Sequence, residues 1–168
     1  MNRYPVERIK YCKIVGVLRV ENIATILRDF GFKVVTQEPE SPDVDVWVYR
    51  DNDLVLVIEV TNWKESCYMD FKRAESIRQN FSEYDESVKK LLMVSFVKNC
   101  MGGESNFEGL EMSVLEVGFQ TQPNTQHHPF FELFKKKGMT DGMRPDSPET
   151  MGILKGKLEA YMKEIGLI

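Results

Sequence analysis

Three acidic residues lie at the ends of apolar segments rich in β-branched residues. Asp43 and Asp45 stand where the segment 44–49 begins, and Glu59 follows the apolar run Leu54–Ile58. A charged carboxylate inside a buried strand is costly unless it is paired or holds a metal ion. Carboxylate oxygens are ligands that suit Mg²⁺ or Mn²⁺. These residue types therefore predict a divalent metal site.

A β-hairpin would bring two of these carboxylates together. If Arg50 faces Leu54 across a three-residue turn, Asp45 faces Glu59 on the neighbouring strand, with their Cβ atoms about 5 Å apart. Two carboxylates at this separation repel each other unless a cation lies between them. A register that differs by one residue would place them on opposite faces of the sheet. The metal site therefore depends on the hairpin register.

An ordered set of residues extends this pattern over about residues 18–100. The set is Glu21-x-x-Ala24-x-x-Leu27-x-x-x-Gly31-Phe32-x-Val34, then Pro42-Asp43-Val44-Asp45-Val46, then Ile58-Glu59-Val60-Thr61. It resembles the PD-(D/E)XK nuclease superfamily, above all its restriction-endonuclease-like and archaeal Holliday-junction-resolvase-like members. The resemblance implies a Mg²⁺- or Mn²⁺-dependent endonuclease that hydrolyses phosphodiester bonds in nucleic acid, in DNA rather than RNA.

The resemblance also implies roles for the acidic residues. Asp45 (or Asp43) corresponds to the aspartate that binds metal, and Glu59 corresponds to the second metal ligand. Glu21, on the first helix, corresponds to an accessory acid that helps to organise the metal. A metal ion held in this way polarises the scissile phosphate and lowers the pKa of an attacking water.

One position departs from the family pattern. The family has a lysine two residues after the glutamate, and this sequence has Thr61 there. The lysine orients the water and stabilises developing negative charge, whereas Thr61 offers only a hydroxyl. Lys64 and Lys72 are the nearest replacements, and we favour Lys72 because it lies on the next expected helix. If no cation fills this place, the resemblance implies a slow nuclease or a relative that only binds nucleic acid or protein.

Candidate contacts to nucleic acid follow Glu59 in the sequence. Trp63 is expected either to pack in the core or to stack on a base. Arg73 and Arg78, with Lys72, form a row that either contacts phosphates or is simply a solvated helix face. The net charge of -4 excludes binding through bulk positive charge, so any nucleic acid must meet a local basic surface.

Hydrophobic periodicity predicts the elements that position these residues. We expect helices over 6–30, 66–81, 130–137 and from 148 onward, and strands over 32–36, 44–49, 54–60, 91–97 and 112–119. The first helix is expected to break or become irregular near Gly16. The second is expected to bury Tyr68, Phe71, Ile77 and Phe81, together with Ala74 or Glu75. The apolar stripe of the last helix is expected to lie in the core rather than at a dimer interface.

This order of elements predicts an α/β fold, with a central mixed β-sheet flanked by helices. The resemblance adds a restriction-endonuclease-like αβββαβ core with a C-terminal strand and helix extension. We expect one nuclease-like domain over residues 1–168, with its core at about 6–120 and a C-terminal helical extension at about 130–168. Resolvase-like relatives commonly pair, so a homodimer remains open.

Composition limits the kinds of site and the cellular compartment that are expected for this protein. The cysteines Cys12, Cys67 and Cys100 are widely spaced and odd in number, which argues against a zinc site and indicates a reducing compartment. No apolar run is long enough to span a membrane, and residues 1–10 are too polar for a signal peptide. We therefore expect a cytoplasmic protein. An unrelated α/β protein with coincidental acids also remains open, and it predicts that Asp45 and Glu59 do not share a face.

Overall fold

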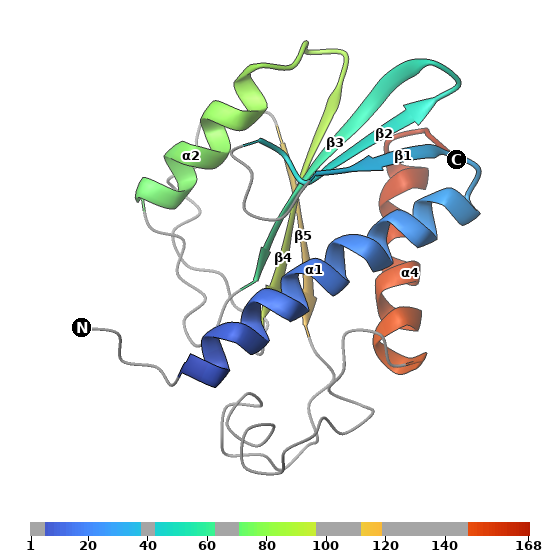
Figure 1. Cartoon of the computed structure of the whole chain (residues 1–168). Helices are drawn as coiled ribbons and strands as arrows, with labels where there is room; N and C mark the ends of the chain where they lie inside the picture. The colour runs from blue at the N-terminus through green and yellow to red at the C-terminus, as the bar shows by residue number, and fades with distance from the viewer. Residues whose placement is uncertain (1–5, 38–42, 63–70, 97–111, 119–147) are drawn as a thin grey trace.

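The computed structural model describes residues 6–37, 43–62, 71–96, 112–118 and 148–168 of the chain. These residues form a helix, three strands, a helix, two strands and a last helix, in the predicted order (Figure 1). They are α1 (Val6–Asp29), β1 (Lys33–Thr36), β2 (Val46–Arg50), β3 (Asp53–Asn62), α2 (Phe71–Ser82), β4 (Lys89–Phe96), β5 (Ser113–Gly118) and α4 (Pro148–Glu164). The helix expected over 130–137 lies outside the described residues.

The strands form one five-stranded mixed sheet in the order β1-β2-β3-β4-β5. The pairs β1–β2 and β2–β3 are antiparallel, whereas β3–β4 and β4–β5 are parallel. The predicted α/β fold with a mixed sheet is confirmed. Because of these directions, β2 begins at the edge of the sheet where β3, β4 and β5 end. Ligand sites in α/β proteins commonly lie at such an edge.

Helices cover the sheet on both faces (Figure 1). On one face, α1 and α4 bury a set that we call the α1/α4 core: Ile23, Ala24, Leu27, Val46, Val48, Leu56, Ile58, Leu91, Met93, Leu154 and Leu158. On the other, α2 buries the α2 core: Val44, Val57, Ala74, Ile77, Phe81, Val88 and Leu92. The strand β3 supplies residues to both cores because its side chains alternate between the two faces. This strand is therefore buried on both sides.

The β2–β3 hairpin reaches the predicted register by an unexpected route. The predicted pairing of Arg50 with Leu54 is wrong: Arg50 pairs with Asp53, and Tyr49 pairs with Leu54. A tight turn makes this possible, because Asp51 adopts a φ of 55°, a left-handed conformation that aspartate tolerates. A bulge then shifts the register next to Tyr49.

Beyond the bulge, the strands return to the predicted pairing. Val48 pairs with Leu56, and Val46 pairs with Ile58. Leu56 lies in the α1/α4 core, and its sequence neighbour Val55 is partly buried against the same core, as expected where a strand contains one extra residue. The bulge therefore restores the predicted pairing at Val48 and Val46, next to Asp45.

Two expectations about the first two helices are wrong. The helix α1 runs unbroken from Val6 to Asp29 through Gly16. A glycine inside a helix costs about 1 kcal/mol relative to alanine, which weakens a helix without ending it. In α2, Ala74, Ile77 and Phe81 are buried as predicted, but Phe71 is 68% exposed.

The last helix, α4, belongs to the same core as the sheet. Leu154, Leu158 and Tyr161 are buried against it, which confirms the prediction that this stripe lies in the core. No helix among the described residues is both long and apolar enough to cross a membrane.

Candidate functional site

Asp45 lies just before β2 and extends the pairing of that strand with β3. Its backbone N–H donates to the carbonyl of Ile58 at 3.0 Å. Its side-chain Oδ2 accepts a hydrogen bond from the backbone N–H of Val60 at 2.7 Å. The carboxylate thus takes the place of a backbone acceptor where the regular ladder has ended.

Glu59 projects from β3 toward the helix α2. Only 4% of the residue is exposed, and the same holds for Thr61, two positions along the strand. The Nη2 atom of Arg73 donates to Glu59 Oε1 and to Thr61 Oγ1, at 3.0 Å in both cases. The three side chains therefore form one bonded cluster between the sheet and α2, and we call it the Glu59 cluster.

The negative charge of Asp45 acts on the buried carboxylate of Glu59. Burial, followed by the negative charge of Asp45, raises the pKa of Glu59 from 4.5 to about 7, although Arg73 and Asn80 act in the opposite direction. Burial also raises the pKa of Asp45, against the Val60 hydrogen bond and the charge of Arg73. The charge of Asp45 thus reaches Glu59, and the charge of Arg73 reaches both carboxylates.

One oxygen of this pair is left open. Glu59 Oε2 is buried and accepts no hydrogen bond within the described part of the chain. The Asn80 side chain is close enough to lower the pKa of Glu59, but it does not satisfy this oxygen. A buried carboxylate oxygen without a partner is costly. It is therefore a position that a cation can fill.

The cation in the Glu59 cluster is Arg73 rather than the favoured Lys72. Lys72 lies on the exposed side of α2. The sequence predicts that Arg73 either contacts phosphates or lies on a solvated helix face, but its guanidinium turns toward the sheet. Its position four residues before the buried Ile77 is the sequence signal that could have identified it, since such residues share a helix face.

Asp43 takes part in a separate hydrogen-bond chain. Its Oδ1 accepts from the backbone N–H of Val44 at 2.7 Å and from the hydroxyl of Tyr84 at 3.0 Å. That hydroxyl in turn accepts from Trp47 Nε1 at 2.8 Å. Burial, together with Asp43, raises the pKa of Tyr84 to about 12 despite the Trp47 hydrogen bond, so the phenol stays protonated at neutral pH.

Glu21 lies apart from Asp45 and Glu59. Glu21 is exposed on α1, which covers the opposite face of the sheet from α2. Across the described ranges, no three His, Cys, Asp or Glu residues form a group that could hold a metal. Arg78 lies 3.7 Å from Glu75 on the same helix. Trp63 and Lys64 lie outside the described residues.

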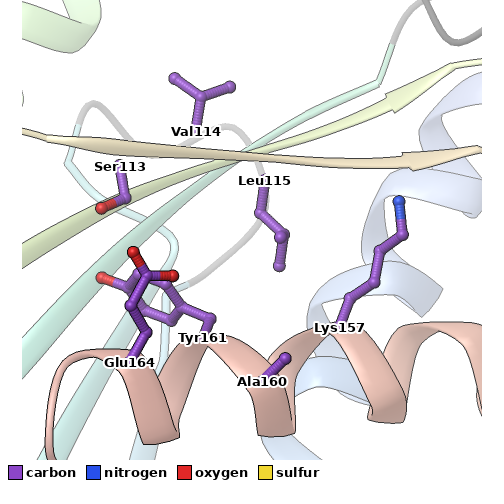
Figure 2. A pocket seen from close by; sticks show the side chains of 7 residues that line it. All are labelled: Ser113, Val114, Leu115, Lys157, Ala160, Tyr161 and Glu164. Atoms are coloured by element: carbon purple, nitrogen blue, oxygen red, sulfur yellow. The ribbon is translucent and has the colours of Figure 1, made fainter.

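A hollow of about 490 Å³ lies between β5 and α4. Ser113 and Leu115 point into it from the strand, whereas Val114 points away (Figure 2). Tyr161 and Glu164 line it from the helix, and burial raises the pKa of Tyr161. This hollow lies on the α1/α4 side of the sheet, so it is separate from the Glu59 cluster.

Comparisons with known proteins assign no family. No protein-family model matches the sequence, and no curated protein matches it. Among solved structures, the crystal structure of AF1548, a protein of unknown function, is similar with a TM-score of 0.41 and 16% sequence identity. The match covers 71% of this chain and 66% of that chain, so this chain spans just under two thirds of that protein.

Proposed function

We propose that this protein is a nuclease that hydrolyses phosphodiester bonds in nucleic acid, DNA in preference to RNA, with a divalent metal at Asp45 and Glu59. The observation that carries the proposal is the meeting of these two carboxylates at one edge of a mixed α/β sheet. The restriction-endonuclease-like core is part of the same proposal. It is supported by the order of elements and by the positions of the two acids at the start of β2 and near the end of β3.

The described residues fit a hard divalent cation. Two carboxylates influence each other at one place, and Oε2 of Glu59 is buried without a hydrogen-bond partner among the described residues. Mg²⁺ is commonly held by one or two carboxylates and completes its shell with water and substrate phosphate. When bound, such an ion polarises the phosphate and lowers the pKa of a coordinated water.

The chain's own residues supply the remaining functions. Asp45 fixes the backbone at Val60 and thereby holds Glu59 in place. Arg73 contributes the positive charge that Thr61 cannot, and its hydrogen bond to Thr61 Oγ1 keeps its guanidinium beside the position of the missing lysine. A guanidinium there can stabilise the negative charge that develops on a phosphate under attack.

A second candidate function is nucleic-acid or protein binding without cleavage. The ion pair between Arg73 and Glu59 favours it, because one carboxylate oxygen is already engaged by a cation. The described residues also offer no third acid at this place. This candidate predicts the same fold and no hydrolysis.

Cleavage assays separate the two functions. Single-stranded, duplex and branched DNA, and RNA, are incubated with Mg²⁺ or Mn²⁺ and wild type, Glu59→Gln or Glu75→Gln. Glu75 is a matched control, since it lies on α2 with its side chain 43% exposed. We expect metal-dependent cutting that only Glu59→Gln abolishes. Substrate binding without cutting by wild type would favour the second candidate, and cutting that survives in Glu59→Gln would contradict the site assignment.

A further inference from the structure

The Arg73 guanidinium occupies the neighbourhood that a metal ion would use. Its Nη2 lies 3.0 Å from Glu59 Oε1, and its charge also lowers the pKa of Asp45. One arginine thus acts on both proposed metal ligands. The cost of burying two like charges side by side is partly offset by this third charge without any metal.

We infer that Arg73 is a built-in counter-ion that competes with the divalent cation for the Asp45–Glu59 pair and so lowers the metal affinity of the site. This inference rests on the proposed function, because it assumes that the pair binds metal. A cation that binds Glu59 either displaces Arg73 from Oε1 or binds the open Oε2 with the guanidinium close by. In both cases, the positive charge of Arg73 opposes the positive charge of the metal.

The side chains of Arg73 and Glu59 differ in how much of each is exposed to solvent. The Arg73 side chain is 37% exposed, whereas that of Glu59 is 5% exposed. The guanidinium can therefore leave toward solvent while Glu59 stays in place. A phosphate group is a favourable partner for a displaced guanidinium, because two N–H groups match two phosphate oxygens.

A competing role and a supporting role for Arg73 predict opposite changes in metal affinity when Arg73 is removed. If Arg73 only orients Glu59 for the metal, removing it should weaken metal binding by roughly 10–100-fold. If Arg73 competes with the metal, removing its charge should strengthen binding by roughly tenfold. The direction of the change therefore decides the question.

Titration calorimetry with Mn²⁺ and with Mg²⁺ measures this change on the metal-free full-length protein. The variants are Arg73→Met, Arg73→Lys and Arg78→Met. Arg78 is the matched control, since it lies on α2 and its ion pair is with Glu75. We expect Arg73→Met to bind metal more tightly than wild type, and Arg73→Lys and Arg78→Met to bind nearly as wild type does. Unchanged or weaker binding by Arg73→Met, with wild type binding metal, would overturn this inference and leave the proposed metal site intact.

Thermal unfolding provides a second readout if Arg73→Met is unstable without metal. Saturating Mn²⁺ should raise the Tm of Arg73→Met, or of Arg73→Gln, by more than it raises the Tm of wild type. The gain should disappear when Glu59→Gln is added. If neither wild type nor any Arg73 variant binds metal, both the inference and the metal-dependent function fail. If Arg73→Met binds metal more tightly but wild type cuts nothing, the inference stands and only the nuclease function fails.

Discussion

The side chain of Asp45 accepts the backbone hydrogen bond of Val60, 2.7 Å away. The residue is therefore part of the fold as well as the proposed metal site. Its backbone N–H continues the contact with Ile58, and its carboxylate satisfies a donor that β2 no longer reaches. A substitution at this position changes both a charge and a structural hydrogen bond, and two different substitutions can separate them.

Asp45→Asn and Asp45→Ala should differ in stability. Both remove the repulsion with Glu59, but only asparagine keeps an oxygen that can accept from Val60. We expect Asp45→Ala to be less stable than Asp45→Asn by about 1–2 kcal/mol, measured by urea unfolding with chelator present. Both should lose most of the metal affinity, whereas Asp43→Asn should retain it. Equal stability of the two Asp45 variants would show that the hydrogen bond contributes little.

Stability should fall as pH rises from about 4.5 to about 7, because burial and Asp45 raise the pKa of Glu59 to about 7. The folded state then binds a proton more strongly than the unfolded state. The stabilisation is complete below the ordinary pKa of 4.5 and is lost as pH rises through about 7. Its size is on the order of 3 kcal/mol, since one pKa unit corresponds to about 1.4 kcal/mol.

Unfolding free energies of metal-free wild type and Glu59→Gln, measured between pH 4.5 and 8, test this dependence. The glutamine cannot titrate, so the slope over this range should be smaller in the variant. Glu75→Gln should keep the wild-type slope. A slope in Glu59→Gln as steep as in wild type would assign the dependence to other groups.

Tyr84→Phe should destabilise the protein by about 1–2 kcal/mol. The phenylalanine leaves Trp47 Nε1 without its acceptor and Asp43 without one donor. Tyr49→Phe is the matched control, because the described contact of Tyr49 is between its ring and Lys33. Urea unfolding of the two variants should therefore give unequal losses, with Tyr49→Phe within about 0.5 kcal/mol of wild type. A loss in Tyr84→Phe as small as that in Tyr49→Phe would mean that the Tyr84 hydroxyl makes no net contribution to stability.

Two phenylalanines of α2 should respond very differently to truncation. Phe81 is fully buried in the α2 core, so Phe81→Ala should cost about 3–5 kcal/mol. Phe71 is 68% exposed at the start of the same helix, so Phe71→Ala should change stability by less than about 0.5 kcal/mol. Chemical denaturation of both variants checks this contrast. A large loss in Phe71→Ala would instead support the burial that its apolar character predicted.

Phe71 and Lys72 are both exposed on α2, whereas Arg73 binds Glu59 on the sheet. Consecutive residues of a helix are about 100° apart, so Arg73 lies about 200° around α2 from Phe71. Placing Phe71 in the core turns Arg73 toward solvent. In the structure, Ala74, Ile77 and Phe81 set the rotation of the helix, and Arg73 faces the sheet beside them. Sequence periodicity did not reveal this rotation, because Phe71 fits the apolar pattern equally well.

The sequence alone determined the order of the elements and the mixed sheet, and it identified Asp45 and Glu59 as acids at neighbouring strand ends. These follow from periodicity and from strand alternation, which are local properties of the chain. Only the tertiary structure decided that a bulge after a tight turn restores the hairpin register, that Tyr84 binds Asp43, and that Arg73 binds Glu59. The two side-chain contacts join residues 41 and 14 positions apart, and they depend on how α2 and its following turn pack on the sheet. That packing is set by the complementary shapes of buried side chains, which no local pattern specifies.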